Sequence, residues 1–221
     1  NERARTREPN KMSPRMAWRA ITSVLPKEAI ISSDFGNNCA IGNAYPTFDE
    51  GRKYLAPGLF GPCGYGFPAI AGAKIAQPDV PVVGFAGDGA FGISMNEMVS
   101  VGRSEWPAIT MVIFRNYQWG AEKRNTTLWF EDNFVGTELD MDVTYAGIAE
   151  QCGLIGVQVD NMDALSEALD TAIAAQMKDK KTTFIEVVLN QELGEPFRRD
   201  AMKQPVAVAG IDPADFRPQT V

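Results

Sequence analysis

Two oxygen-bearing side chains, Asp88 and Asn116, stand where they could bind a divalent cation. Asp88 lies between Gly87 and Gly89 directly after an apolar run, and Asn116 follows a second apolar run 28 positions later. Carboxylate and amide oxygens suit a hard ion such as Mg2+, which commonly takes few ligands from protein and the rest from phosphate and water. If the two runs are neighbouring strands, both oxygens could face one ion, and N–H groups near the glycines could bind a diphosphate.

The same glycines allow a second interpretation, a dinucleotide-binding turn. Residues 87–92 (Gly-Asp-Gly-Ala-Phe-Gly) match G-x-G-x-x-G between a predicted strand and a helix. A carboxylate at position 88 would repel a pyrophosphate unless a cation intervened, and the following strand ends in Arg115-Asn116 instead of an acidic residue for the ribose. We therefore favour the cation site and keep an NADP-binding oxidoreductase domain as an alternative. A helix N-cap remains the plainest structural role for Asp88.

The composition excludes several classes of function. The chain of 221 residues has no histidine, so it cannot by itself supply a Ser-His-Asp triad, a Cys-His pair or a His-ligated zinc. Its net charge of −7 leaves no basic footprint for nucleic acid or an anionic membrane, and its apolar runs are too short to span a bilayer. Three widely spaced cysteines, Cys39, Cys63 and Cys152, favour a reducing compartment, so we expect a cytoplasmic location.

The elements that must position Asp88 and Asn116 alternate between strand and helix patterns. Strands are predicted at 29–33, 80–86, 108–114, 154–159 and 183–189, and helices from Ser13-Pro14 onward and at about 67–77, 94–104, 144–152 and 163–177. Residues 34–38 are expected to form a functional loop, and the polar, aromatic-rich stretch 117–140 receives no regular element. This pattern predicts an α/β fold with a mostly parallel sheet, helices on both faces and a ligand at the carboxyl ends of the strands.

The motif spacing resembles a known enzyme family. Gly87-Asp88-Gly89 followed by Arg115-Asn116 is similar to the G-D-G…N-N motif of thiamine diphosphate enzymes, with Arg115 at the place of the first Asn. Residues 87–97, 118–123, 133–137 and 193–201 resemble the sulfoacetaldehyde acetyltransferases of the acetolactate synthase-like branch. The resemblance implies a thiamine diphosphate-binding fold and conversion of sulfoacetaldehyde and phosphate into acetyl phosphate and sulfite. It also implies Mg2+ held by Asp88, Asn116 and the backbone carbonyl of Gln118.

The resemblance further implies a set of cofactor contacts. These are Gly36, Asn37, Asn38, Cys63, Gly64, Tyr65, Gly87, Asp88, Gly89, Ala90, Asn116, Gln118, Trp119 and Gly120. An ordinary Asx turn would also explain residues 36–38, and tight backbone packing would explain residues 63–65. No catalytic residue is assigned, because the family's activating glutamate comes from the pyrimidine-binding domain of a neighbouring subunit. We therefore expect a homodimer or homotetramer, and no activity from this chain alone.

The resemblance predicts a domain order for the chain. Residues 1–13 would be a linker from a preceding domain, 14–192 the diphosphate-binding domain and 193–221 an extended C-terminal tail. Lys123 and Arg124, or Arg198 and Arg199, are hypothesised to bind sulfonate or phosphate, with a solvated surface or subunit contact as the alternative. Other functions left open are an acetolactate synthase, a 2-oxo acid decarboxylase and a non-catalytic binding subunit.

Overall fold

The core of the molecule is one parallel sheet. The computed structural model describes residues 11–48, 50–130, 133–139 and 142–192. Within them, six strands pair in the order β2-β1-β3-β4-β6-β5, and every pair is parallel. The strands are β1 (Ile30–Ser33), β2 (Tyr54–Leu55), β3 (Val82–Gly87), β4 (Thr110–Arg115), β5 (Ile155–Val159) and β6 (Thr183–Val188). The predicted α/β fold is confirmed, and β2 is a strand that the sequence analysis did not foresee.

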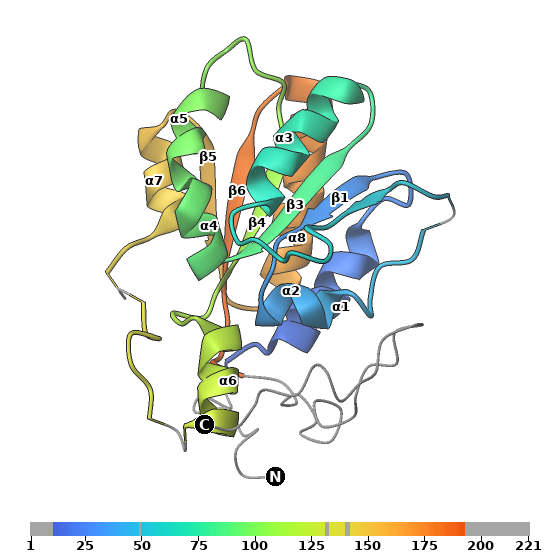
Figure 1. Ribbon diagram of the computed structural model, residues 1–221. Helices are drawn as coiled ribbons and strands as arrows, with labels where there is room; N and C mark the ends of the chain where they lie inside the picture. The colour runs from blue at the N-terminus through green and yellow to red at the C-terminus, as the bar shows by residue number, and fades with distance from the viewer. Residues whose placement is uncertain (1–10, 49, 131–132, 140–141, 193–221) are drawn as a thin grey trace.

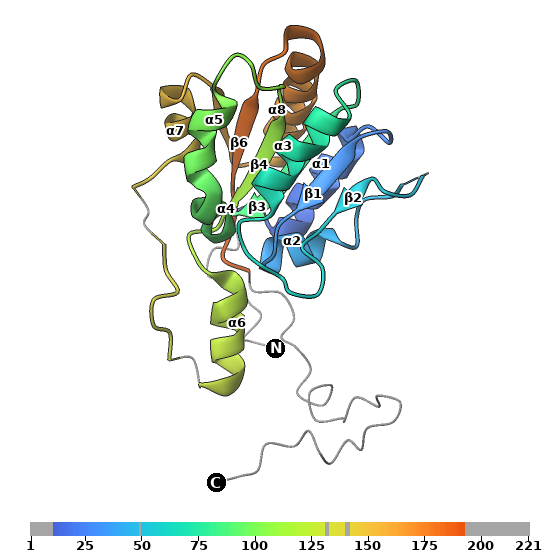
Figure 2. The ribbon, with the colours of Figure 1, turned by 45° about the horizontal axis from the view of Figure 1, so that its top comes forward.

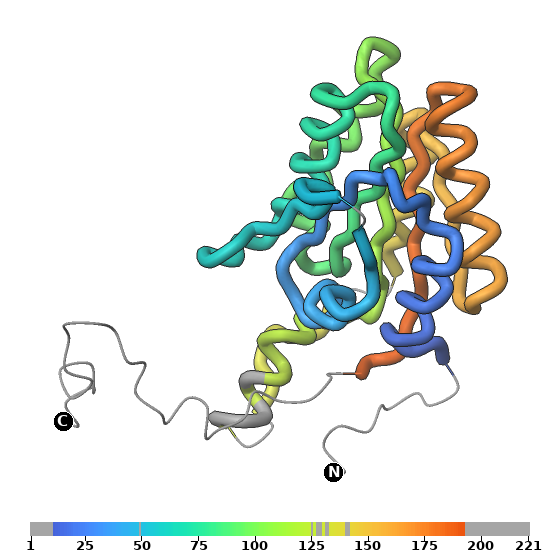
Figure 3. The backbone as a smooth tube through the Cα atoms, turned by 90° about the vertical axis from the view of Figure 1, so that its right-hand side faces the viewer, coloured from blue at the N-terminus to red at the C-terminus, as the bar shows by residue number. Residues whose placement is uncertain are grey.

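Helices cover both faces of the sheet, as predicted. On one face lie α1 (Pro14–Val24) and α8 (Met162–Ala174), and on the other lie α3 (Gly66–Ala76), α4 (Asp88–Ser94), α5 (Met98–Val101) and α7 (Tyr145–Gln151) (Figures 1 and 3). Alternate residues of each strand enter one of two apolar clusters. Trp18 packs on Phe85 and Phe114 in the first cluster, with ring centroids 4.7 and 5.3 Å away. Phe67, Phe91 and Phe184 form the centre of the second.

The helix predicted at about 94–104 begins earlier than expected. Helix α4 starts at Asp88, directly after an extended Gly87, and continues through a 3-10 turn (Met95–Glu97) into α5. The sequence prediction was wrong here because Gly89 and Gly92 lower helix propensity over this stretch. Packing overrides that propensity, since the fully buried ring of Phe91 secures the first turn to the core. As a result, the helix N-terminus lies at the end of β3.

Two further helices stand where no helix was predicted. Helix α2 (Asn37–Gly42) replaces the expected loop, because the Trp18 indole donates to the Asn38 carbonyl at 2.9 Å and Gly42 lies flat against the same ring. Helix α6 (Gly120–Trp129) occupies part of the stretch assigned no element and projects beyond the sheet (Figure 2). Neither has the apolar periodicity of a helix packed on a sheet, so its sequence carries little signal.

The ends of the described region bear on the predicted domain boundaries. Met12, inside the predicted linker, is buried, and its carbonyl accepts from the Asn190 N–H at 2.9 Å. The remaining linker residues 1–10 and the predicted tail 193–221, with Arg198 and Arg199, lie outside the described residues, so the boundaries stay predictions. A π-helical turn (Ala175–Asp179) links α8 to the segment before β6. In the part of the chain that is described, no helix is long and apolar enough to cross a membrane.

Candidate functional site

Three neighbouring strands end at the same edge of the sheet. The pairing register places Ser33 of β1 beside Phe85 of β3, and Gly87 beside Phe114 of β4. The first residues after these three strands are Asp34, Asp88 and Asn116. Asp88 and Asn116 therefore follow adjacent strands, which was the condition for both oxygens to face one ion. Helices α2, α4 and α6 also begin here (Figure 1). This is the edge where open parallel sheets bind their ligands.

A cavity opens at this edge and gathers most of the predicted cofactor contacts. Its walls include Gly36, Asn37, Asn38, Cys63, Gly87, Asp88, Gly89, Ala90, Asn116, Gln118, Trp119 and Gly120. The empty space is about 650 Å³, counted out to the open mouth. Gly64 and Tyr65 belong to the same loop as Cys63 but do not line the cavity. Four segments far apart in sequence therefore meet at one place.

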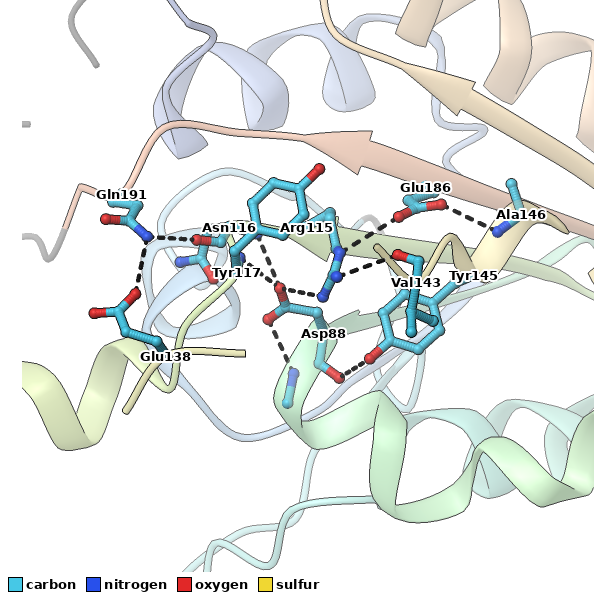
Figure 4. A network of polar contacts seen from close by, with 11 residues as sticks. Asp88, Arg115, Asn116, Tyr117, Glu138, Val143, Tyr145, Ala146, Glu186 and Gln191 are labelled. Carbon is cyan, nitrogen blue, oxygen red and sulfur yellow. Dashed lines mark hydrogen bonds and ion pairs between the residues drawn. The ribbon is translucent and has the colours of Figure 1, made fainter. Parts of the chain in front are cut away.

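The Asp88 carboxylate accepts four hydrogen bonds in this cavity. Its Oδ2 accepts from the backbone N–H of Tyr117 at 2.7 Å, the N–H of Asn116 at 3.1 Å and Nη1 of Arg115 at 3.2 Å (Figure 4). Oδ1 accepts from the N–H of Gly89 at 2.9 Å. Tyr117 has a left-handed φ of 59°, a strained conformation for a non-glycine residue, at the turn that aims two successive N–H groups at Oδ2.

Burial gives this carboxylate an unusual proton affinity. Asp88 is 1% exposed, and desolvation raises its pKa to about 6, although the Tyr117 N–H and the charge of Arg115 both act to lower it. A raised pKa means that the ionised form lacks enough stabilisation from the protein alone. A cation beside Oδ1 would supply that stabilisation. The carboxylate is therefore better suited to a metal-bound state than to a bare one.

Two side-chain oxygens of residues that line the cavity lack partners among the described residues. Asn38 Oδ1 and Gln118 Oε1 are both buried and accept no hydrogen bond in the described structure. An unsatisfied buried acceptor costs roughly 1–3 kcal/mol, so two on one wall indicate a ligand that donates or a cation. Among the described residues, no group of three or more His, Cys, Asp or Glu side chains could hold a metal. The donor set is thus one carboxylate with amide and carbonyl oxygens, which fits Mg2+ shared with a phosphate.

The helix starts at the cavity are open to an anion. Helices α2, α4 and α6 have Gly36, Gly87 and Trp119 at their N-caps, and none of these residues makes a side-chain capping bond; in α4 the Gly89 N–H donates to Oδ1 of Asp88. Gly36 has a φ of 135°, which only glycine adopts readily, so the chain can turn sharply into α2. The first N–H groups of a helix lack partners within the helix and carry partial positive charge. Three such starts around one cavity suit a diphosphate.

The sequence analysis placed Asp34 in an expected functional loop, residues 34–38, but assigned it no role. Its buried carboxylate accepts from the N–H groups of Phe35 at 2.8 Å, Gly64 at 3.1 Å and Gly66 at 2.7 Å. Burial raises its pKa, and these hydrogen bonds partly offset that effect. Through these bonds Asp34 holds the glycine-rich loop against the end of β1; Cys63 lies in this loop. An acidic residue directly after an apolar strand was the available signal.

The cysteines on the cavity wall are neutral thiols. Burial raises the pKa of Cys39 to about 12, and its Sγ lies 3.7 Å from the Phe85 carbonyl oxygen. Burial also raises the pKa of Cys63, with the charges of Asp34 and Glu122 adding to the effect. Neither thiol is activated as a nucleophile. Both cysteines therefore line the cavity as neutral thiols.

The sequence analysis also missed the contact between Arg115 and Glu186. Both side chains are buried, and the guanidinium of Arg115 lies between the carboxylates of Asp88 and Glu186. Glu186 is an acidic residue in the middle of the apolar strand β6. A charge in such a strand signals a buried partner, because an isolated ion there is costly. That signal was present in the sequence and was not used.

Lys123 and Arg124 do not line the cavity. Lys123 is buried, forms an ion pair with Glu138 and lies 5.1 Å from the centre of the Phe134 ring. Arg124 donates through Nη1 to Oδ1 of Asn37 at 3.3 Å, so it joins α6 to α2. The expectation of a solvated surface is wrong for Lys123. The hypothesis of anion binding by these two residues gains no support from their positions.

Comparisons with known proteins agree with this geometry. The family model described as thiamine pyrophosphate enzyme, C-terminal TPP binding domain, matches residues 34–187. The sulfoacetaldehyde acetyltransferase of Roseovarius nubinhibens is 74% identical over the whole chain, and that of Castellaniella defragrans is 44% identical over 90% of it. The match covers 36% and 33% of those two relatives, so the chain spans about a third of their length.

A solved structure shares the fold. The thiamine diphosphate-dependent 4-hydroxybenzoylformate decarboxylase of Rhodococcus jostii RHA1 aligns with a TM-score of 0.72 and 23% identity, over 81% of this chain and 33% of its own. The acetolactate synthase large subunit of Haemophilus influenzae is 24% identical over 81% of this chain and 31% of its own. Both are distant compared with the acetyltransferases.

Proposed function

We propose that the cavity holds thiamine diphosphate together with Mg2+, from the premise that this chain belongs to the thiamine pyrophosphate enzymes and forms their C-terminal TPP binding domain. The observation that carries the proposal is a pair of buried oxygens without partners in the cavity that Asp88 also lines. Asn38 Oδ1 and Gln118 Oε1 accept no hydrogen bond from the described residues, and the Asp88 carboxylate of the same cavity has a raised pKa. Leaving these oxygens unpaired costs free energy, whereas a bound cation would stabilise them.

The proposal assigns different groups of the cavity to the cation, the diphosphate and the organic part of the cofactor. Asp88, Asn116 and the backbone carbonyl of Gln118 would bind the cation, and the first N–H groups of α2 and α4 would bind the diphosphate oxygens. The loop fastened by Asp34, with the neutral Cys63 thiol, would border the organic part of the cofactor. When bound, the cofactor supplies the carbanion chemistry that this histidine-free chain lacks. The chain itself binds and orients.

The substrate proposal follows the close relatives. Sulfoacetaldehyde acetyltransferases are 73–75% identical to this chain in three bacteria, whereas an acetolactate synthase is 24% identical. We propose that the chain is the diphosphate-binding domain of such an enzyme, which converts sulfoacetaldehyde and phosphate into acetyl phosphate and sulfite in sulfonate metabolism. A cytoplasmic homodimer or homotetramer, in which a partner subunit supplies the activating glutamate, completes the proposal. The isolated chain would then be inactive.

Cofactor binding can be tested by thermal unfolding. Thiamine diphosphate should raise the melting temperature when Mg2+ is present and have little effect after chelation, because the diphosphate meets Asp88 only through the cation. NADPH is the matched control ligand, since the G-x-G-x-x-G match offers it a competing role. Stabilisation by NADPH without metal, and none by thiamine diphosphate, would overturn the proposal.

Product analysis of the full-length enzyme separates the activities. Sulfoacetaldehyde and phosphate should yield sulfite and acetyl phosphate in equal amounts. Release of CO2 from pyruvate or another 2-oxo acid, with no sulfite from sulfoacetaldehyde, would instead indicate an acetolactate synthase or a decarboxylase. The 221-residue chain serves as the control and should form no product.

A further inference from the structure

The guanidinium of Arg115 connects two buried carboxylates. Its Nη1 lies 3.2 Å from Oδ2 of Asp88, its Nε lies 3.5 Å from Oε1 of Glu186, and its Nη2 donates to the Val143 carbonyl at 3.2 Å (Figure 4). All three charged side chains are at most 1% exposed. Charges this deep in a protein persist only where geometry and partners compensate for the loss of water. This cluster therefore needs a reason beyond surface chemistry.

Two tyrosines confine the guanidinium between the carboxylates. Its carbon lies 4.2 Å from the ring centre of Tyr117 and 5.1 Å from that of Tyr145. The Tyr145 hydroxyl also donates to the backbone carbonyl of Asp88 at 3.1 Å, so the same ring contacts both sides of the ion pair. A planar fork stacked on aromatic rings is an arrangement that a lysine ammonium could not reproduce. Arg115 is thus held in one orientation.

Glu186 is anchored on regular secondary structure. It lies on β6, where it pairs in register with Ile113 of β4, and its Oε2 accepts from the Ala146 N–H at 3.1 Å. Ala146 is in the first turn of α7. A line of polar contacts thus runs from α7 through Glu186 and Arg115 to Asp88. Groups supported by a helix and two central strands are held more accurately than groups on loops.

The two oxygens of Asp88 differ in what they have left to accept. Oδ2 receives three donors, from Arg115, Asn116 and Tyr117, while Oδ1 receives one, from Gly89. An ionised carboxylate has about four lone-pair sites, two on each oxygen. Oδ2 is therefore saturated and Oδ1 retains a free site. Two carboxylates and one guanidinium also leave a net charge of −1, which a divalent cation would balance.

We propose that Arg115 and Glu186 are positioning residues that keep Oδ2 of Asp88 occupied by protein donors and so reserve Oδ1 for the divalent cation. The inference rests on the proposed function, because it concerns the metal of the same site. Glu186 acts through Arg115, and Arg115 acts through Asp88, so neither touches the cation or the cofactor. Arg115 stands where the family motif has an asparagine, and an asparagine is too short to reach both carboxylates.

The test is the affinity for Mn2+, measured by electron paramagnetic resonance in the full-length enzyme with saturating thiamine diphosphate. Arg115→Met should weaken Mn2+ binding roughly 10- to 100-fold, the usual effect of removing a partner behind a metal ligand. Glu186→Gln should weaken it less, and the double variant should be no weaker than Arg115→Met, because Glu186 acts through the guanidinium. Arg115→Lys, which keeps the charge without the fork, should lie between Arg115→Met and the unaltered enzyme and alter the spectral line shape.

The matched control is Lys74→Met. Lys74 is also a buried cation, but it contacts the Val80 carbonyl and the Met177 sulfur near the opposite ends of the strands. Its loss should lower the melting temperature and change Mn2+ affinity by no more than about twofold, because mutations at distant sites with no shared partners act almost independently. Unchanged affinity in Arg115→Met and Arg115→Lys would overturn the inference, as would additive losses in the double variant. No Mn2+ binding by the unaltered enzyme would overturn the proposed function itself.

Discussion

Two buried polar clusters lie at opposite ends of the same strands and differ in how well their groups are paired. Near the amino ends, the Gln176 amide accepts from the Val82 N–H at 2.9 Å and donates to the Val82 carbonyl at 2.7 Å and to Thr110 Oγ1 at 2.9 Å. At the carboxyl ends, Asn38 Oδ1 and Gln118 Oε1 have no hydrogen-bond partner in the described structure. One amide is satisfied by the protein, and the other two are not.

The difference separates groups that stabilise the fold from groups that we propose to bind a ligand. A satisfied buried amide joins elements together, here the turn after α8 to β3 and β4, and needs nothing further. Unsatisfied oxygens cost free energy in the bare protein and recover it when a ligand binds.

The largest expected effect comes from Asp88→Asn, which changes the ligand-binding cluster and preserves its shape. We expect Mg2+-dependent affinity for thiamine diphosphate to fall by more than about 100-fold. This loss exceeds the usual effect of removing a hydrogen-bond partner of a metal ligand, because here the charged ligand oxygen itself is lost. The melting temperature without ligand should stay nearly unchanged, since the variant loses charge-assisted bonds and also removes a buried charge. Isothermal titration and thermal unfolding measure the two quantities. A large drop in ligand-free stability would place Asp88 with the structural groups.

The opposite outcome is expected for Gln176→Leu in the other cluster. It leaves the Val82 N–H without its side-chain acceptor and removes both donor contacts, so unfolding should become easier by about 2–4 kcal/mol. Affinity for Mg2+ and thiamine diphosphate should remain within about twofold, because the two clusters share no residue. Chemical denaturation and the same titration check both statements. Weakened cofactor binding in a folded Gln176→Leu protein would contradict the separation of the clusters.

The pH dependence of the bare protein should also reflect the ligand-binding cluster. The pKa of Asp88 is raised from 3.8 to about 6, so the folded state holds this proton more tightly than the unfolded state. The resulting stability is complete below pH 3.8 and is lost as the pH rises through 6, by at most about 3 kcal/mol. Cofactor affinity should change in the other direction and weaken about tenfold for each pH unit below 6, since the cation needs the ionised carboxylate.

Two measurements isolate this contribution from other titrating groups. Thermal unfolding of the ligand-free protein between pH 4 and 7.5 should show a smaller loss of stability in Asp88→Asn than in the unaltered chain. Titrations at pH 5 and 7 should show the predicted weakening in the unaltered chain. An identical stability profile in the two proteins would show that Asp88 does not titrate in this window.

Sequence alone was sufficient for those parts of the site that depend on local pattern. Runs of apolar residues predicted five of the strands, and the positions of Asp88 and Asn116 directly after two of them indicated that both oxygens could face one ion if those strands were neighbours. Helix α6 could not be found this way, because it projects from the sheet and lacks an apolar stripe. The contact of Arg115 with Glu186 joins positions 71 apart, and nothing local in either segment specifies its partner.

The smallest predicted effect tests how closely the wall of the ligand-binding cluster is packed. A Cβ on Gly89 would come within 2.8 Å of the Trp119 ring, which lines the cavity, so Gly89→Ala must displace that ring. Overpacking of this kind costs about 1–3 kcal/mol, and we expect the low end, about a fivefold loss of cofactor affinity. Tryptophan fluorescence should shift as well, and Trp119→Phe added to Gly89→Ala should restore part of the affinity by making room.

Gly72→Ala, on an exposed position of α3 where a Cβ meets nothing within 4 Å, is the matched control and should leave affinity unchanged. Full affinity in Gly89→Ala would mean that the cavity tolerates movement of this wall, and the ligand would then depend on the polar groups around Asp88 rather than on a fixed shape.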